Sequence, residues 1–407
     1  MIIIYPWLLF SFAVVLQLCS SARGQDGLYG IEVEQLFPSV KLELHSDEDS
    51  PKSDSPWSYE PVCTAEIKSI GSALCVYTQT HFSDGRGISL FTTPDIARQI
   101  LASSPFNTPS SLADSGSNIP QDSWFTKPVP GKGIGVFAKK PIPRGQVVTA
   151  NTPVLVVYSE TFLPKAEREA LLRLATDQLP PSSRDALLSL SKVFNNPEIP
   201  IQDIIAGNAF GLEIGAQAHL AVFPEVSRVN HDCSPNSQFY LDSDSLTHFV
   251  RAVRPIAENE EVTIAYSNPL APFSERQKAL FKGFHFKCGC SRCLRGEAAD
   301  IALQEIAELQ SILSNWTPAS KANVKVAERL VKLYAQEGLE GYADPAYCHV
   351  ALTYSAAGSA RGARKYYDLA LESHQLRLGP MASDLGACNG MKDNIEKHWS
   401  WRRRKSG

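Results

Sequence analysis

The sequence predicts an α+β protein, with small β-sheets in its central region and helices in its C-terminal part. Residues 124–266 contain many short apolar runs broken by Gly, Pro and Asn, which is typical of short strands and turns. Beyond Cys293, apolar residues recur at helical spacing instead. The 407-residue chain is 43% hydrophobic and 20% charged, which is typical of a globular protein and excludes disorder over the whole chain.

An uncharged apolar segment opens the chain. No side chain from Met1 to Leu18 is charged, and small residues follow up to Gly24. This pattern predicts a secretory signal peptide over residues 1–24, although only the α-amino group supplies the usual positive charge. An uncleaved membrane anchor is the alternative, because about 18 apolar residues lie at the lower limit of a membrane span. With a signal peptide removed, we expect no membrane span in the mature chain.

Residues 25–121 are expected to hold a small module between two linkers. Residues 46–58 are rich in Ser, Asp and Pro, and they predict a flexible acidic linker. The module spans about residues 59–106 and includes a helix that opens at Thr93-Pro94-Asp95. A second linker, rich in Ser, Pro and Asn, covers residues 107–121.

Two stretches carry apolar residues at helical spacing. The first is an insertion at about residues 160–195, inside the β-rich region 122–267, and the second is the C-terminal part, residues 297–407. The last segments of that part resemble tetratricopeptide-type helices. One or two such units cannot bury their own apolar faces, so we expect them to cover the preceding domain rather than to bind a peptide. The periodic positions are Leu171, Leu172, Leu174, Leu187, Leu188, Leu190, Ile306, Leu309, Leu313, Val326, Leu330, Leu333, Ala363, Tyr366 and Tyr367.

The charge of the chain argues against a direct nucleic-acid site. The formal net charge is −4, whereas phosphate binding needs a basic face. The tail Arg402-Arg403-Arg404-Lys405 is a local exception, and we interpret it as a solvated end, with a targeting or nucleic-acid role as the alternative. We expect the chain to be a monomer.

Four short motifs carry the chemistry, and a glycine-rich turn is the first of them. It is not a dinucleotide fingerprint, because Pro141 and Pro143 block the helix that would have to follow. Residues 85–91 show almost the same pattern, but only the later copy leads into a hairpin and the strand at 154–157. The four motifs are Gly131-Lys132-Gly133-Ile134-Gly135-Val136-Phe137-Ala138, Asn230-His231-Asp232-Cys233-Ser234-Pro235-Asn236, Glu260-Glu261-Val262-Thr263-Ile264-Ala265-Tyr266 and Phe286-Lys287-Cys288-Gly289-Cys290-Ser291-Arg292-Cys293.

In this order the four motifs resemble those of SET-domain methyltransferases, over roughly residues 124–295. The resemblance implies a SET β-fold over residues 122–267, in which the Asn-His motif threads a loop as a pseudoknot. It also implies a post-SET zinc segment over residues 268–296. The expected activity is methyl transfer from S-adenosyl-L-methionine to a lysine side chain of a protein substrate.

The resemblance assigns a role to each motif. Asn230 is expected at the amino-acid end of the cofactor, because an amide both donates and accepts hydrogen bonds. His231 helps to hold the cofactor, partly through its backbone, and Phe286 faces the adenine ring. Asn208 resembles the Asn of an Asn-x-Phe segment that lines the cofactor or lysine channel. The expected cofactor-binding set is Lys132, Gly133, Ile134, Asn208, Asn230, His231, Tyr266 and Phe286.

Tyr266, at the end of the third motif, is the expected catalytic residue. In the family, this tyrosine lies beside the sulfonium and the incoming amine. A lysine amine with a pKa of about 10.4 must lose its proton before it attacks the methyl carbon. A nearby cation and a desolvated channel both disfavour the ammonium form. Positioning of the amine by the tyrosine hydroxyl supplies much of the remaining rate.

Four cysteines are expected to bind one structural zinc ion. Cys288, Cys290 and Cys293 supply three thiolates within six residues, and a closed tetrahedral site needs a fourth. In the SET-and-MYND branch of the family, the cysteine of the Asn-His motif provides it, here Cys233. Disulfide pairing of these cysteines is the alternative, in view of the signal peptide.

Two further cysteines, Cys63 and Cys75, either form a disulfide in an oxidising compartment or act as two small buried hydrophobic residues.

The post-SET segment and the helical C-terminal part also resemble the SET-and-MYND branch. The insertion contains no cysteine, so the MYND finger is missing, as in a type of SET-domain protein associated with fungi. Two other functions stay open: methylation of a small amine, and a non-catalytic, zinc-stapled binding module in a secretory compartment. The compartment itself is open, because the signal peptide indicates export whereas the family resemblance indicates nucleus or cytoplasm.

Overall fold

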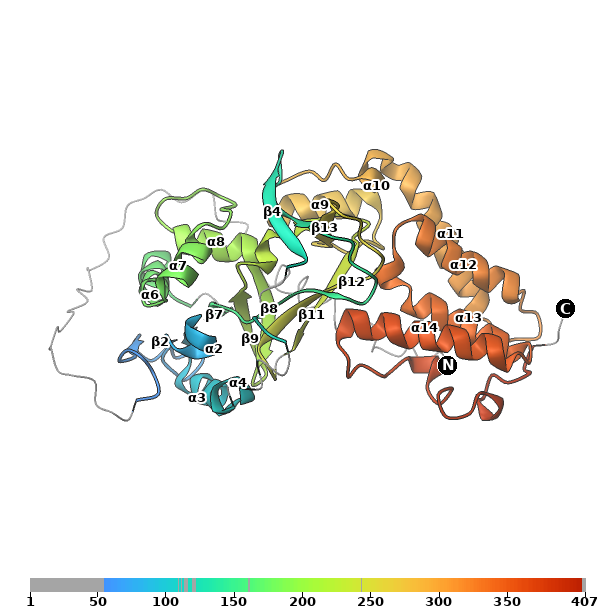
Figure 1. Cartoon of the computed structure of the whole chain (residues 1–407), viewed down its shortest axis with the longest axis horizontal. Helices are drawn as coiled ribbons and strands as arrows, with labels where there is room; N and C mark the ends of the chain where they lie inside the picture. The colour runs from blue at the N-terminus through green and yellow to red at the C-terminus, as the bar shows by residue number, and fades with distance from the viewer. Residues whose placement is uncertain are drawn as a thin grey trace.

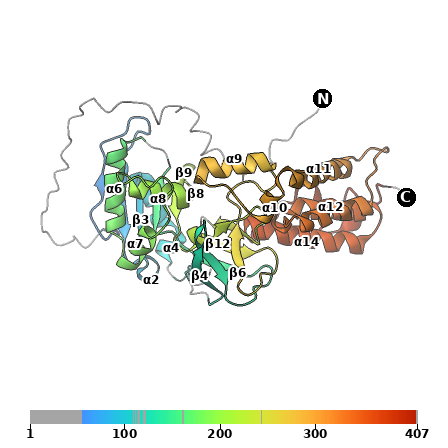
Figure 2. The same cartoon turned by 90° about the horizontal axis from the view of Figure 1, so that it is seen from above.

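We describe a computed structural model of the chain over residues 55–404, except for residues 109, 111, 113–115, 119–121, 160–161 and 243. The predicted signal peptide and most of the predicted acidic linker lie outside these residues. The fold is α+β, as the sequence predicts. Helices α11 to α14 form one end of the molecule, the sheets lie in the middle, and α6 to α8 lie at the other end (Figures 1 and 2).

The largest sheet has six strands in the order β1-β2-β3-β7-β9-β8. Strand β3 pairs with β7 in parallel, and all other pairs in this sheet are antiparallel. The strands are rich in β-branched and aromatic residues, which favours a buried sheet. They are β1 (Val62–Cys63), β2 (Cys75–Gln79), β3 (Ile88–Thr92), β7 (Leu155–Tyr158), β8 (Ala209–Ile214) and β9 (Gln217–Val222).

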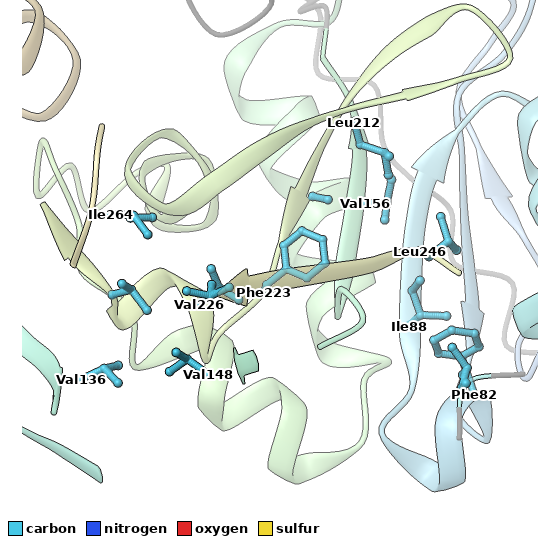
Figure 3. Close-up of a cluster of buried hydrophobic side chains, with 14 of the residues drawn as sticks. Phe82, Ile88, Val136, Val148, Val156, Leu212, Phe223, Val226, Leu246 and Ile264 are labelled. Atoms are coloured by element: carbon cyan, nitrogen blue, oxygen red, sulfur yellow. The ribbon is translucent and has the colours of Figure 1, made fainter. Parts of the chain in front are cut away.

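The N-terminal module does not stand apart, as its placement between two linkers had suggested. Its strands β2 and β3 belong to the same sheet as β7 to β9. Figure 3 shows that Phe82 and Ile88 from this module share one hydrophobic core with Phe223 and Ile264. Its helices are α2 (Phe82–Gly85), α3 (Pro94–Ala102), which Thr93 caps as predicted, and α4 (Ser104–Asn107).

The described residues of the predicted second linker are packed rather than free. Leu112 is only 4% exposed. The side-chain amide of Asn118 donates to Ser83 Oγ at 2.7 Å and to Thr152 Oγ1 at 2.8 Å. This segment therefore ties the module to the central sheets. Sequence composition could not reveal this, because each of these contacts joins residues far apart in the chain.

Two smaller sheets complete the β-structure. One has the order β10-β13-β5-β4, and the other has the order β11-β12-β6. The strands are β4 (Trp124–Val129), β5 (Gly133–Ala138), β6 (Val147–Asn151), β10 (Asn230–His231), β11 (Ser237–Asp242), β12 (Thr247–Ala252) and β13 (Glu261–Ile264). The glycine-rich motif forms the turn of the β4–β5 hairpin and its second strand, and the tyrosine motif contains β13.

The insertion is helical, as predicted, but it extends further. Its first two helices, α6 (Lys165–Asp177) and α7 (Pro181–Leu188), match the predicted spacing. A third helix, α8 (Pro200–Asn208), lies beyond the predicted end and leads directly into β8. The three helices bury Leu172, Leu187 and Ile204 against the six-stranded sheet.

The C-terminal part consists of helices, as its spacing predicts. The preceding segment, residues 268–296, contains α9 (Phe273–Phe284) and α10 (Ser291–Leu294). The α-helices of residues 297–407 are α11 (Asp300–Ser314), α12 (Val324–Gln336), α13 (Asp344–Ala356) and α14 (Ala360–Leu378). The last of them lies against the central sheets, where Arg144 donates to Glu372 Oε1 and Ser373 Oγ. Near the chain end, Arg404 stacks on Trp316 at 3.8 Å and donates to Leu313 O, so this basic residue is packed rather than solvated.

The described residues contain two disulfides. Cys63–Cys75 joins the facing residues of β1 and β2, and it selects the first of the two readings that the sequence left open. Cys348–Cys388 ties α13 to the segment that follows α14 and was not predicted. Of the helices in the described part of the chain, none has the length and apolar character that crossing a membrane requires.

Candidate cofactor and zinc site

The Asn-His motif runs beside the tyrosine strand. Strand β10 pairs with β13 in parallel, with Asn230 opposite Thr263. Further on, the side chain of Asn236 donates to Glu261 O at 2.8 Å and accepts from Thr263 N at 2.9 Å. An amide side chain can donate and accept at once, so Asn236 makes the two hydrogen bonds to Glu261 and Thr263 that the backbone of a neighbouring strand would otherwise make. The motif is thus held against β13 at both ends, in the irregular path that a pseudoknot requires.

Asn230 lies between the glycine strand and Glu261. Its side-chain amide donates to Glu261 Oε1 at 2.8 Å, and the other carboxylate oxygen of Glu261 pairs with Lys132 Nζ at 3.1 Å. A Cβ atom at Gly135 would lie 2.8 Å from Glu261 Oε1 and 2.9 Å from Asn230 Nδ2. A larger residue here would therefore force a neighbouring side chain to move. The sequence singled out Asn230, Lys132 and the glycine, but it gave no role to Glu261.

His231 and Tyr266 are joined by a hydrogen bond. Tyr266 N donates to His231 Nδ1 at 2.9 Å, which fixes the proton of a neutral imidazole on Nε2. Burial lowers the pKa of His231 to about 4, so the ring is neutral at physiological pH. The Tyr266 hydroxyl donates to Val229 O at 2.8 Å. Burial, with a smaller effect from Glu261, raises the pKa of Tyr266 above its usual value.

Two phenylalanines at and just after the end of α9 lie near this pair. The rings of Tyr266 and Phe284 are 4.8 Å apart, and those of His231 and Phe286 are 6.1 Å apart. Phe286 is thus near the residues to which the sequence linked it. The contact of Phe284 with Tyr266 was not predicted, although Phe284 lies only two residues before Phe286. These aromatic side chains form an apolar wall beside the candidate catalytic tyrosine.

The four predicted cysteines come together. Their sulfur atoms all lie within 4.8 Å of one another, and Cys233 Sγ is 3.5 Å from Cys293 Sγ. Zinc–sulfur bonds of about 2.3 Å in a tetrahedron place sulfurs about 3.8 Å apart, so the spacing fits one ion. None of the four forms a disulfide. This favours zinc over the alternative of disulfide pairing.

Two buried arginines flank the sulfurs, and they provide a second test of the fit. Arg276 is fully buried, and its Nε and Nη2 atoms have no hydrogen-bond partner among the described residues. Burial would lower the pKa of Arg276, but the sulfurs of Cys233 and Cys293 outweigh that effect and raise it. Arg292, which is 1% exposed, donates to Cys233 O at 2.8 Å. Four thiolates around Zn²⁺ carry two net negative charges, which two buried guanidinium groups would compensate.

Asn208 lies at the junction between the insertion and β8, and its amide is occupied. It donates to Ser191 O at 2.7 Å and to Ile204 O at 2.8 Å. These hydrogen bonds do not join its side chain to Asn230, so its expected role at the cofactor stays a prediction. It does hold Ser191, whose hydroxyl oxygen lies 3.5 Å from the position of a Cβ on Gly133. Asn208 thereby places the insertion over the glycine turn.

The loop of the insertion that follows Ser191 is anchored by a residue that the sequence reading missed. Asp203, which is 1% exposed, accepts from Val193 N and Phe194 N at 2.8 Å each. Phe194 in turn contacts the His285 ring, at 4.8 Å between centroids. The sequence shows only that a carboxylate lies close to this loop. Its burial and the amides that it binds are seen only in the folded chain.

Comparisons with known proteins agree with this geometry. The SET domain family matches residues 133–267. The histone-lysine N-methyltransferase set5 of Schizosaccharomyces pombe is 33% identical over 168 residues, which are 41% of this chain and 49% of the relative. The mouse histone-lysine N-methyltransferase SMYD3 is 35% identical over 116 residues, or 28% of this chain and 24% of the relative. The histone-lysine N-methyltransferase ATXR2 of Arabidopsis thaliana is 40% identical over 82 residues, or 19% of this chain and 17% of the relative.

The chain spans half or less of the length of these relatives. The matched family segment contains the glycine strand, the Asn-His motif and the tyrosine strand, and it ends just after Tyr266. Residues 133–267 are therefore a SET domain, and this chain is a SET-domain protein similar to histone-lysine methyltransferases, including members of the SET-and-MYND group.

Proposed function

We propose that this chain transfers a methyl group from S-adenosyl-L-methionine to a lysine side chain of a protein substrate. The observation that carries the proposal is the convergence of Asn230, His231 and Tyr266 on one strand, β13, through the contacts described above. These residue types are the ones that the chemistry needs: an amide for a zwitterionic ligand, and a tyrosine hydroxyl beside the reacting amine.

The chain offers a consistent set of groups to hold this cofactor. The Asn230 amide can bind the amino-acid end, and Lys132, Gly133 and Ile134 provide a turn at the mouth of the site, where Gly133 has φ +78°. Phe286 provides an apolar face for the adenine ring. When bound, the cofactor supplies a methyl group on a sulfonium, an electrophile that needs no activation by a metal.

Tyr266 orients the amine rather than removing its proton. Its pKa is raised by burial, so the hydroxyl stays protonated at physiological pH and acts through hydrogen bonds. The incoming lysine loses its proton to solvent before attack, because burial against Phe284 and Tyr266 disfavours the ammonium form. The rate then comes mainly from holding the neutral amine in line with the methyl carbon.

We further propose that Cys233, Cys288, Cys290 and Cys293 hold a structural zinc ion. All four positions of a tetrahedron are filled by sulfur, so the ion has no open position for catalysis. Its role would be to fix the Phe284–Phe286 segment against the Asn-His motif, because Cys288 closely follows that segment and Cys233 belongs to the motif.

One observation favours a second candidate, a non-catalytic binding module that retains the fold. The described residues contain two disulfides, which are typical of oxidising compartments, whereas the cofactor is made in the cytosol. The two candidates differ in one property. An enzyme binds the cofactor and transfers the methyl group, and a binding module does neither.

The test is incubation of the zinc-loaded protein with labelled S-adenosylmethionine and a protein extract. We expect incorporation into protein that Tyr266→Phe abolishes. Labelling confined to the small-molecule fraction would favour methylation of a small amine. If calorimetry detects no cofactor binding by the zinc-loaded protein, both enzyme functions are wrong and the binding module is favoured.

A further inference from the structure

The residues that follow α12 contact the Asn-His motif at Ser234. The Ser234 hydroxyl donates to Glu337 O at 2.9 Å. A Cβ on Gly338 would lie 2.7 Å from Ser234 Cβ, and Gly338 has φ +66°, a conformation that other residues rarely adopt. Glycine is thus needed here both for the backbone turn and for the close approach to Ser234. The helical C-terminal part therefore meets the Asn-His motif through the Ser234 side chain, packed against the backbone of Glu337 and Gly338.

A buried charge network reinforces this contact. The Glu337 carboxylate is 7% exposed and accepts from Arg295 Nη1 at 3.0 Å and Nη2 at 2.5 Å. Its Oε2 atom also lies 3.4 Å from Nε of the buried Arg292. Arg292 in turn donates to the backbone oxygens of Cys233 at 2.8 Å and Pro269 at 2.9 Å. The network runs from the end of α12, through Arg292, to the backbone of a candidate zinc ligand.

The position of Cys233 is coupled to that of the candidate cofactor residues. Cys233 lies two residues after His231, whose ring accepts a hydrogen bond from Tyr266 N. Strand β10 contains only two residues, so it has few ladder bonds of its own and depends on what holds its ends. Glu337 is the carboxylate that pairs with buried Arg292, and removing one partner of a buried pair leaves an uncompensated charge.

We propose that Glu337 and Gly338 are positioning residues of the cofactor site, through which the helical C-terminal part holds the Asn230–His231 segment and the four sulfurs in place. This inference rests on the proposed function, because it takes Asn230 and His231 to bind the cofactor. It gives the helical part a role in cofactor binding rather than only in covering the SET domain.

The test compares two variants with matched controls in the full chain. Glu337→Gln removes the buried carboxylate, and Glu305→Gln is its control, because Glu305 forms an exposed pair with Arg329 in the same helical part. Gly338→Ala introduces strain and a contact with Ser234. Its control is Gly386→Ala, which has similar strain at φ +58° but nothing within 4 Å. Glu337→Asp is the conservative variant.

Calorimetry with S-adenosylmethionine on zinc-loaded protein gives the first readout. We expect Glu337→Gln and Gly338→Ala to bind the cofactor about tenfold more weakly. Both controls should stay within about twofold of the wild type, and Glu337→Asp should recover part of the loss. In turnover assays, KM for the cofactor should rise more than kcat falls.

Cobalt(II) in the thiolate site gives a second readout that needs no cofactor. Its visible absorption should shift in Glu337→Gln and Gly338→Ala but not in the controls, because only the first two release the backbone at Cys233. Wild-type affinity and an unchanged cobalt spectrum in both variants would overturn this inference and leave the proposed function standing. A wild-type protein that fails to bind the cofactor would overturn the proposed function instead. The cobalt spectra would then still show whether Glu337 and Gly338 hold the four sulfurs in place.

Discussion

The four-stranded sheet around Asn230 and the helices α11 to α14 differ in what stabilises them. The helices bury regularly spaced apolar residues such as Ala327, Leu330 and Val350. The sheet around the site also buries apolar residues such as Ile264, but the segments of the site are joined by polar contacts, among them Asn236 to β13 and Arg292 to Cys233. Apolar burial tolerates many substitutions of similar size, whereas a buried polar network fails when one member is left unpaired.

This contrast predicts that single changes in the site will affect function far more than changes among the helices. We expect the effects on the site to decrease from the thiolate cluster, through Tyr266 and Gly135, to Asp344.

The thiolate cluster should be the most sensitive point. Cys293→Ser removes one ligand and leaves buried Arg276 and Arg292 without full charge compensation. We expect zinc content to fall from about one ion per chain to almost none, with loss of cofactor binding. Metal analysis and calorimetry measure this. The control, Cys348→Ser with Cys388→Ser, removes a disulfide from the helical part and should leave the zinc content unchanged. Full zinc in Cys293→Ser would contradict the assignment.

Tyr266→Phe should separate chemistry from binding. The variant loses the hydroxyl that bonds to Val229 O but keeps the ring against Phe284. We expect kcat to fall by about a hundredfold or more, with cofactor affinity nearly unchanged. Steady-state kinetics and calorimetry give the two values. Tyr334→Phe, at a buried tyrosine of α12, is the control and should keep full activity. An active Tyr266→Phe variant would remove this tyrosine from the mechanism.

Gly135→Ala should weaken cofactor binding without loss of the fold. The new Cβ would lie within 3 Å of both Glu261 and Asn230, so one of these side chains must move. We expect the cofactor Kd to rise about tenfold. Gly283→Ala, in α9, adds a methyl group where nothing lies within 4 Å, and it serves as the control. Equal affinities in the two variants would show that the Asn230–Glu261 contact does not matter for the cofactor.

Asp344→Asn should destabilise the helical part and leave the site intact. Burial would raise the pKa of Asp344, but hydrogen bonds from His374 and Arg377 and the charge of Arg377 lower it overall. Breaking this buried network should cost about 3 kcal/mol of unfolding free energy. Cofactor affinity, measured well below the unfolding temperature, should stay within about twofold of the wild type.

The same carboxylate predicts a dependence of stability on pH. Because its pKa is lower in the folded protein than the unfolded value of about 3.9, Asp344 contributes its full stabilisation above that pH. The contribution is lost as pH falls through the folded pKa. The unfolding free energy, measured with denaturant at a series of pH values, should therefore fall more between neutral and acidic pH for the wild type than for Asp344→Asn. An equal fall in both proteins would contradict the lowered pKa of Asp344.

How much the sequence revealed also differs between the two regions. The helices of the C-terminal part were predicted from local spacing, because positions such as Val326, Leu330 and Leu333 determine a buried face within a few turns. The site was predicted only through its motifs, since Cys233 and Cys293 are 60 residues apart and no local pattern joins them. Resemblance identified Asn230, His231, Tyr266 and the four cysteines.

Other contacts of the site could not be predicted in either way. Glu261, Arg292 and Glu337 look like ordinary charged residues in the sequence, which are usually solvated. Their roles depend on burial and on partners from other elements, as in the pair between Arg292 and Glu337. The packing of the N-terminal module into the six-stranded sheet was missed for the same reason, because neither strand sequence indicates that β3 pairs with β7.

Methylation of lysine by this site can be measured through the identity of the labelled amino acid after acid hydrolysis of protein that the zinc-loaded chain has methylated. We expect label in methylated lysine, and none when the Tyr266→Phe variant replaces the wild type. A wild-type chain that binds both zinc and S-adenosylmethionine but yields no labelled lysine would contradict it.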